Sequence, residues 1–189
     1  MSSILLSPPA IEPWTLSEAK NFLRVAHADD DAVITSLIAA ARGQIEAQTR
    51  CGLIAQTWRI ARDHWPEDGR VALRIGPPRN VVAARVFDAA GNARVVDAGR
   101  FVLDKAAGVI AAPPWSLPQP GRAVAGIELD VEIGFGANAA SVPQLLRHAV
   151  RSLVAHWYDN RGLMAIGGNV AMMPGSVHAM IASYRVLSL

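Results

Sequence analysis

Five histidines and one cysteine are the side chains of this sequence best suited to binding a transition metal or acting as a nucleophile. The histidines are His27, His64, His148, His156 and His178. No two of them have the i, i+4 spacing of a helical zinc site. Cys51 stands alone, which excludes an internal disulfide and a zinc site built from cysteines. It precedes Gly52 at a predicted helix end, whereas reactive thiolates favour helix N-termini, so we expect a structural cysteine.

Carboxylates alternate with apolar residues on one predicted strand, 126–135. The acidic positions are Glu128, Asp130 and Glu132. Carboxylate oxygens bind hard cations, but a calcium site needs further oxygen ligands and a glycine-turned loop, which this strand lacks. We therefore expect a strand with one acidic, water-exposed face and predict no metal site.

Sequence motifs of enzymes and cofactor sites are absent. There is no G-x-G-x-x-G after a strand, no P-loop and no G-x-S-x-G nucleophile motif. His156 and Asp159 lie one helical turn apart, but no nucleophile accompanies them, and a solvated helix face is the favoured interpretation. We predict no enzymatic activity and no bound cofactor.

The composition is that of a globular domain with its own core. The length of 189 residues and a hydrophobic content of 51% are enough to bury a core without disulfides. No run of about 18 apolar residues occurs, so no membrane span is predicted. The first residues, MSSILLSPPAIEPW, lack the basic region and apolar length of a signal peptide, and we expect a cytoplasmic protein.

The clearest helix pattern lies at 141–162, SVPQLLRHAVRSLVAHWYDNRG. Ser141 and Gln144 have the spacing of a capping box, and Gly162 suits the left-handed position after a helix. These signals predict a helix over 142–161. Its apolar pairs shift by about 40° every four residues, so the apolar stripe winds round the helix. Either one broad face is buried, or the two ends face different partners.

Two further helices are predicted upstream. Thr15 and Glu18 form a second capping box that opens a helix over 16–25. The acidic run DDD suits the first turn of a helix over 29–50. Together with 142–161, these helices predict a small core of three main helices.

A β-rich insertion over 56–135 separates the second and third helices. It contains short alternating runs divided by turns rich in Asp, Pro and Gly. The order of helices, strands and helices favours an α+β fold, with a main domain over 15–162. Residues 1–14, rich in Pro and Ser, are expected to form an extended N-terminal arm.

Residues 163–189 are predicted to be a C-terminal docking segment. The part 163–175 is apolar and rich in Gly and Met, and Ser176 is placed to cap a short helix over 177–185. Nine residues are too few for an isolated helix to be stable in water. The helix must therefore pack on its own domain or on a partner, and the adaptable methionines favour a partner.

Binding to DNA would require a concentrated basic face. The net charge is only +2, from 18 basic and 16 acidic residues. Arg147 and Arg151 share one face of the helix 142–161, but His148, His156 and Asp159 dilute the charge. A small DNA-binding regulatory protein that uses this helix is the alternative to the function considered next.

Two blocks of the sequence resemble head–tail connector (adaptor) proteins of long-tailed phages and gene transfer agents. The first is LSEAKNFLRVAHADDDAVITSLIAAARGQIEAQTRCGLIAQTWRI, similar to the family's N-terminal signature. The second is GFGANAASVPQLLRHAVRSLVAHWYDNRG, followed by a closing SYRV. The resemblance covers most of 15–162 and 174–186, more weakly in the β insertion. The N-terminal arm and the loop 112–121 carry no family motif.

The resemblance implies a structural adaptor that forms a ring, usually dodecameric, beneath the portal of a capsid. Such a ring prolongs the DNA channel, without sequence-specific DNA binding, and meets stopper or tail-completion proteins. The implied location is the neck of a virion or gene transfer agent particle assembled in the bacterial cytoplasm.

Candidate contact residues lie at the end of the helix 142–161 and in the docking segment. A ring needs two different complementary surfaces on each subunit. We expect subunit or portal contacts from Trp157, Tyr158, Arg161, Met172, Met173, Val177, Met180, Ile181, Tyr184 and Arg185. For Trp157, a position in the subunit's own core is the competing interpretation.

Overall fold

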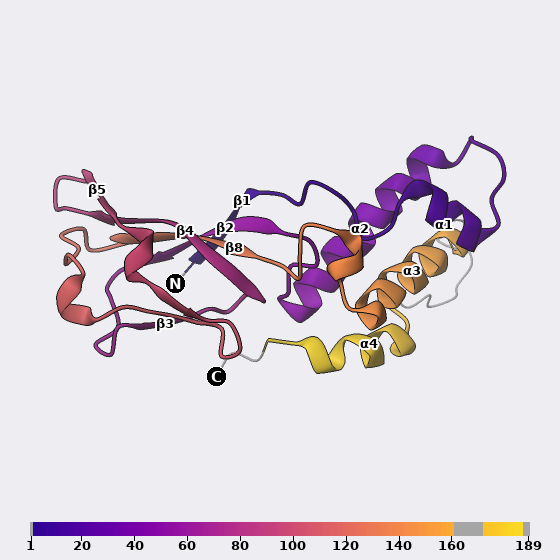
Figure 1. The fold of residues 1–189 in the computed structure, drawn as a ribbon. Coiled ribbons are helices and arrows are strands. Elements are labelled where there is room, and N and C mark those ends of the chain that lie inside the picture. Colours follow the sequence, from indigo (N-terminus) through magenta and orange to yellow (C-terminus); the bar gives the residue numbers. More distant parts are fainter. Residues whose placement is uncertain (1, 161–171, 187–189) are drawn as a thin grey trace. The chain divides into compact units, whose positions relative to one another are not determined.

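The computed structural model describes residues 2–160 and 172–186 (Figure 1). The chain divides into two compact units. The β unit holds Ala55–Phe135 and the N-terminal residues up to Ala10, and the helical unit holds Ile11–Ile54 and the described residues from Gly136 to Val186. This mixed content confirms the predicted α+β class. The units differ from the predicted segments, because the N-terminal residues join the β unit and the C-terminal helix joins the helical unit.

The described part of the helical unit contains the α-helices α1 (Leu16–Leu23), α2 (Asp31–Thr49), α3 (Gln144–Asp159) and α4 (Gly175–Ile181). Helix α2 packs against α1, α3 and α4, and α3 also packs against α4. Buried apolar side chains at helical spacing form the core between α2 and α3, as expected of amphipathic helices. They are Ile34, Ile38, Ala41, Ile45, Leu146, Ala149, Val150, Leu153 and Val154.

The capping box predicted at α1 is confirmed. The Glu18 amide donates to the Thr15 hydroxyl at 3.2 Å, and the Thr15 amide donates to a Glu18 carboxylate oxygen at 2.8 Å. Hydrogen bonding lowers the pKa of Glu18, first from the Thr15 amide, against a smaller opposing effect of burial. Arg24 ends α1 in the left-handed conformation.

The capping box predicted at Ser141 and Gln144 is wrong. Ser141 ends a short 3-10 turn, and Pro143, with an extended backbone, takes the position before the first helical residue of α3. The Ser141 side chain lies against Gly136, where an added Cβ would come within 2.3 Å of the Ser141 hydroxyl. Ser141 therefore lies two residues before the cap position of α3.

Two other predicted helix ends also change. Helix α4 begins at Gly175 behind Pro174, so the predicted cap at Ser176 lies inside the first turn and makes no capping bond. The helix continues as the 3-10 turn Ala182–Tyr184, so the predicted span 177–185 is shifted and divided. Gly162 lies outside the described residues.

The β unit contains two antiparallel sheets. The larger sheet has the strand order β1-β2-β8-β4-β5, with β1 (Ser2–Ser7), β2 (Gln56–Arg62), β8 (Ile127–Ile133), β4 (Pro78–Phe87) and β5 (Ala93–Val96). The smaller sheet has the order β3-β7-β6, with β3 (Arg70–Ala72), β7 (Val109–Ala111) and β6 (Val102–Asp104). The N-terminal arm therefore contributes an edge strand, paired with β2 from Ser2 to Ser7.

Strand β8 lies at the centre of the larger sheet, between β2 and β4. Its apolar side chains Ile127, Leu129, Val131 and Ile133 are buried, as the alternation predicted. They share one hydrophobic core with Val71 of β3 and Ile110 of β7, so the two sheets are joined through this core. Among the described residues, no helix is long and apolar enough to cross a membrane.

Candidate interaction surfaces

The acidic residues of β8 face arginines of the two neighbouring strands. Arg59 of β2 binds Asp130 through two bonds, Nε to Oδ1 at 2.7 Å and Nη2 to Oδ2 at 3.0 Å. Arg85 of β4 donates from Nη1 to the same carboxylate at 2.7 Å. The side chain of Asp130 is only 6% exposed. Burial alone would raise the pKa of Asp130, but the bonds and charges of the two arginines outweigh it and hold the pKa below its usual range.

The prediction that the acidic face of β8 is exposed to water is therefore wrong. Glu128 also pairs with Arg59, at 3.2 Å, and Glu132 pairs with Arg79, at 3.2 Å. The register of the sheet places Arg59 directly opposite Asp130, so cross-strand pairing neutralises the acids. In the part of the chain that the structure describes, no cluster of metal-ligating side chains is found. The arrangement is an ion-pair network.

The two arginines of α3 are engaged inside the helical unit. The Arg147 guanidinium lies 4.6 Å from the ring centre of Trp14, and Arg151 lies 4.4 Å from that of Phe22. Arg147 also donates to the Pro13 carbonyl at 3.2 Å. Cations over aromatic faces are stabilised by the ring quadrupole. These two arginines hold Trp14 and helix α1 on α3.

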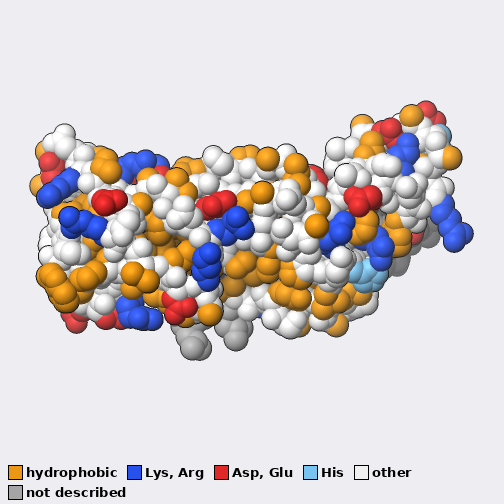
Figure 2. Space-filling model, viewed as in Figure 1, with side chains coloured by type: hydrophobic (Ala, Val, Ile, Leu, Met, Phe, Trp, Pro, Cys, Tyr) orange, Lys and Arg blue, Asp and Glu red, His pale blue; other side chains and the backbone are white. Residues whose placement is uncertain are grey.

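The exposed charges on the face drawn in Figure 2 are mixed. Basic and acidic side chains alternate over this face, and no large basic area stands out. A nucleic-acid surface would instead gather its lysines and arginines on one face.

The end of α3 contacts two other segments of the helical unit. The Trp157 indole Nε1 donates to the Met172 carbonyl at 2.8 Å, and the Tyr158 hydroxyl donates to the Asp30 carboxylate. Both rings are half-buried. Met172 is 77% exposed beside this contact. Arg161, which we expected at the same surface, lies outside the described residues.

The C-terminal helix packs on its own unit. Val177 and Ile181 are fully buried, and Met173 is buried before the helix begins. The Val186 amide donates to the Thr49 carbonyl at 2.9 Å, which ties the end of this segment to the end of α2. Of the two alternatives for this helix, packing on its own domain is the one observed. The other predicted contact residues remain accessible in part: Met180 and Tyr184 are half-buried and Arg185 is exposed.

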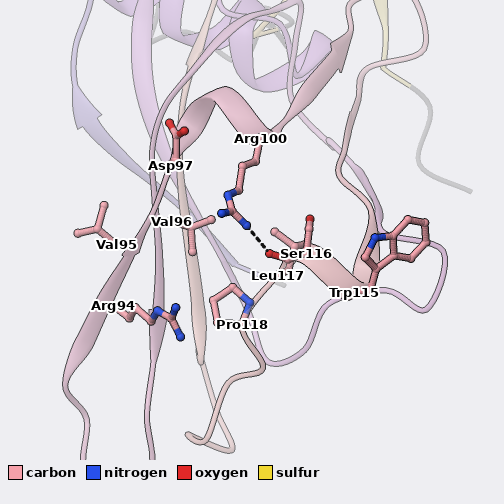
Figure 3. A pocket seen from close by; sticks show the side chains of 9 residues that line it. All are labelled: Arg94, Val95, Val96, Asp97, Arg100, Trp115, Ser116, Leu117 and Pro118. Atoms are coloured by element: carbon pink, nitrogen blue, oxygen red, sulfur yellow. Dashed lines mark hydrogen bonds between the residues drawn. The ribbon is translucent and has the colours of Figure 1, made fainter.

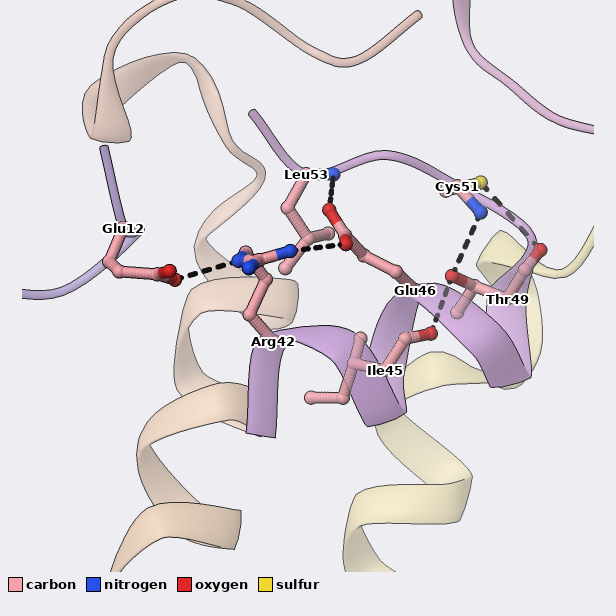
Figure 4. Close-up of polar contacts among 7 residues, drawn as sticks. All are labelled: Glu12, Arg42, Ile45, Glu46, Thr49, Cys51 and Leu53. Atoms are coloured by element: carbon pink, nitrogen blue, oxygen red, sulfur yellow. Dashed lines mark hydrogen bonds and ion pairs between the residues drawn. The ribbon is translucent and has the colours of Figure 1, made fainter. Parts of the chain in front are cut away.

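A polar network closes the C-terminal end of α2 (Figure 4). Arg42 bridges Glu12 and Glu46, each at 2.7 Å, and Glu46 accepts the Leu53 amide at 2.7 Å. Burial alone would lower the pKa of Arg42, but its two carboxylate partners raise it. The network fixes the turn that leads out of α2.

Cys51 lies in the same turn and behaves as a structural cysteine. Its thiol donates to the Tyr184 carbonyl at 3.2 Å, and its amide donates to the Thr49 hydroxyl at 3.2 Å. The side chain is buried, and this burial raises the pKa of the thiol. The thiolate needed for reactivity is therefore disfavoured.

Two apolar surfaces were not singled out by the sequence patterns. All six residues of β1 are exposed, including Ile4, Leu5 and Leu6, and β1 is the edge of its sheet. Trp115, in the Pro-rich loop, is 88% exposed. The signals present in the sequence were the apolar run ILL between serines and a lone tryptophan among prolines.

Trp115 is one of the residues that line a hollow with a volume of about 420 Å³ in the β unit, and its indole points outward from the loop (Figure 3). The hollow is lined by residues 94–97 from β5 and the turn after it, by Arg100, and by residues 115–118 of the loop. Arg94 and Val95 of this lining are exposed. The hollow combines an exposed indole, apolar side chains and arginines.

Comparison with known proteins relates the whole chain to one class of assembly. The sequence profile of the phage gp6-like head–tail connector protein family matches residues 13–73 and 121–185. Comparison with curated proteins gives no match.

Solved structures extend the similarity over the full length. A chain in the neck of an empty gene transfer agent particle, computed with C6 symmetry, is 31% identical with a TM-score of 0.82. A chain in the virion of the native particle is 31% identical with a TM-score of 0.80, and a chain in the native neck, computed with C12 symmetry, is 31% identical with a TM-score of 0.79. Each match covers 100% of this chain and 97% of the other.

Proposed function

Because the chain belongs to the phage gp6-like head–tail connector family, we propose that it forms a dodecameric ring between the portal and the stopper or tail proteins of a particle. The protein is a structural head–tail connector of a phage or gene transfer agent particle. In the proposed ring, DNA passes through the channel without sequence-specific binding. The particle would assemble in the bacterial cytoplasm.

The observation that carries the proposal is the full-length match to neck proteins. At 31% identity over 100% of this chain, both the helical unit and the β unit have counterparts in a neck subunit. The C12 symmetry used for one of those necks supports a twelve-fold ring. Rings of identical chains use head-to-tail contacts between two different surfaces of each subunit.

The outer edge of β1 is one surface suited to a neighbouring copy. It is an apolar edge without the devices that protect exposed edges, since Ser2–Ser7 contains no charge and no proline. Its side chains are exposed on both faces of the strand. We assign this edge to the subunit–subunit contact, which would cover Ile4, Leu5 and Leu6.

The end of α3 and the outer side of the C-terminal segment are suited to the portal. Met172 is exposed beside Trp157. Tyr184 and Arg185, which follow α4 in the sequence, are half-buried and exposed, respectively. Methionine and aromatic side chains adapt well to partner surfaces. Val177 and Ile181 contribute by holding α4 on the helical unit, because their side chains are fully buried there.

We propose no catalytic role. The carboxylate most removed from water, Asp130, is held ionised between two arginines, which suits an ion pair better than proton transfer. The DNA-binding alternative rests on Arg147 and Arg151, and both stack on aromatic rings of the same unit. A salt titration distinguishes it, because a DNA binder loses affinity steeply as salt rises.

Deletion and replacement of the gene in a strain that produces the particles tests the proposed function. Without the chain, we expect DNA-filled heads that lack tails. An epitope-tagged copy should restore tailed particles and be located in the neck as a ring by electron cryomicroscopy. Normal tailed particles without the chain, or a tagged chain absent from the neck, would overturn the proposal.

A further inference from the structure

Trp115 is presented by a loop whose backbone is held by hydrogen bonds to residues 116 and 118. The Ser116 carbonyl accepts Arg100 Nη1 at 2.7 Å (Figure 3), and the Pro118 carbonyl accepts the indole of Trp65 at 2.9 Å. Leu117, two residues after Trp115, is buried in the core of the β unit. The 3-10 turn Pro114–Ser116 is closed by the Ser116 amide, which donates to the Pro113 carbonyl at 2.9 Å. The indole is therefore exposed on a rigid support.

Exposing the apolar ring of a tryptophan to water is unfavourable in free energy, and a rigid exposed tryptophan is well suited to binding. Burying its ring removes a large apolar area from water, and tryptophan is enriched among the residues that dominate interfaces. Because the loop is already fixed, little backbone entropy is lost on binding.

The charge of the hollow points to an acidic partner. Arg94 is exposed, and no described residue forms an ion pair or a hydrogen bond with its side chain. Arg100 adds a second positive charge, and the carboxylate of Asp97 is occupied by the Gly99 amide at 3.0 Å. A carboxylate of the partner would form an ion pair with the Arg94 guanidinium.

The place of this surface in the sequence separates it from the shared part of the family. The family profile matches 13–73 and 121–185 and leaves out 74–120, which contains Arg94, Trp115 and the rest of the hollow's lining. A surface in the remaining segment suits a partner that differs between particles.

We infer that the Trp115 hollow binds an acidic, apolar segment of a particle protein other than the connector itself. This inference rests on the proposed function, since the partner is taken from the same particle. The indole enters an apolar site on the partner, and a partner carboxylate pairs with Arg94.

Site-specific photocrosslinking in assembled particles tests the inference. A benzoylphenylalanine replaces Trp115 in the full-length chain, and purified particles are irradiated and the crosslinked peptides are mapped. We expect crosslinks to a second particle protein, at a peptide that contains Asp or Glu. Within this crosslinkable chain, Arg94→Glu should lower the yield at least about tenfold by opposing like charges, whereas Arg94→Lys should retain it. Arg74→Glu, at another exposed arginine of the β unit, is the matched control and should leave the yield unchanged.

The outcomes separate this inference from the proposed function. If particles contain the normal amount of the connector but position 115 crosslinks only to other connector copies, only to DNA, or to nothing, the inference is overturned while the function stands. An unchanged yield in the Arg94→Glu variant overturns it as well. A chain that is absent from the particles overturns both.

Discussion

Arg59 and Asp130 form a two-bond ion pair between neighbouring strands β2 and β8, although 71 residues separate them in the sequence. Arg85, from the strand on the other side, binds the same carboxylate. The pair lies at the centre of the larger sheet, where Asp130 is almost fully buried. Its contribution is to fix the register of the three central strands.

Removing the carboxylate charge should destabilise the β unit. Asp130→Asn leaves two arginines without their shared partner, and we expect a loss of about 2–3 kcal/mol in the free energy of unfolding. Urea denaturation followed by circular dichroism measures this. Glu132→Gln, in the more exposed pair with Arg79, is the control and should change stability by less than about 1 kcal/mol. Equal effects of the two variants would contradict the central role of Asp130.

The same ion pair predicts a pH dependence. The pKa of Asp130 is lower in the folded protein than its usual value, so below about pH 4 the unfolded chain binds protons more readily. The stability that Asp130 contributes is present above this range and is lost as the pH falls through the folded pKa. The difference in unfolding free energy between wild type and Asp130→Asn should therefore shrink from neutral pH to about pH 3. A constant difference would exclude this linkage.

The C-terminal helix should be needed for the stability of the helical unit. Ile181→Ala removes a fully buried side chain and is expected to cost about 2–4 kcal/mol. His178→Ala, at an exposed position of the same helix, should have little effect. Urea denaturation compares the two variants.

The reactivity of the Cys51 thiol measures whether the C-terminal segment is packed on the helical unit. The thiol is buried and donates to the Tyr184 carbonyl of that segment. A thiol reagent should react slowly with the native chain and rapidly after deletion of residues 163–189. We expect that deletion to destabilise the helical unit, since Val177 and Ile181 belong to its core. A truncated chain with wild-type stability and an unreactive thiol would show that the segment is dispensable.

The edge strand β1 should be needed for assembly and not for folding. Leu5→Lys places a charge on an exposed position of the edge, the device by which monomeric proteins block edge pairing. The melting temperature should stay within a few degrees of wild type, while incorporation into particles falls. Val82→Lys, at an exposed position of β4, is the control. Normal incorporation of the Leu5→Lys chain would show that β1 does not form the contact between subunits of the ring.

The portal surface is tested by Met172→Ala. Met172 is exposed, so its truncation should leave the melting temperature unchanged and reduce binding of the purified chain to heads that carry a portal. Val33→Ala, at an exposed position of α2, is the matched control. Binding equal to that of the control would place the portal contact elsewhere. Trp157→Phe then tests the indole bond to the Met172 carbonyl.

Features that depend on adjacent residues could be predicted from the sequence. The Thr15–Glu18 capping box forms as predicted because both partners lie within one helical turn. The alternation of β8 placed Leu129 and Val131 in the core for the same local reason. The quoted sequence blocks identified the connector family, and the profile and structure matches agree.

Features that depend on distant partners were decided by the tertiary structure. Ser141 had the spacing of a cap, but Pro143 takes the cap position of α3 and the Ser141 side chain lies against Gly136. The acids of β8 looked exposed until the strand register brought Arg59 and Arg85 beside them. A side chain's neighbours across a sheet are set by how the whole chain pairs, which no local pattern encodes. The exposure of Trp115 follows in the same way, because Arg100 and Trp65 fix the loop from outside its own sequence.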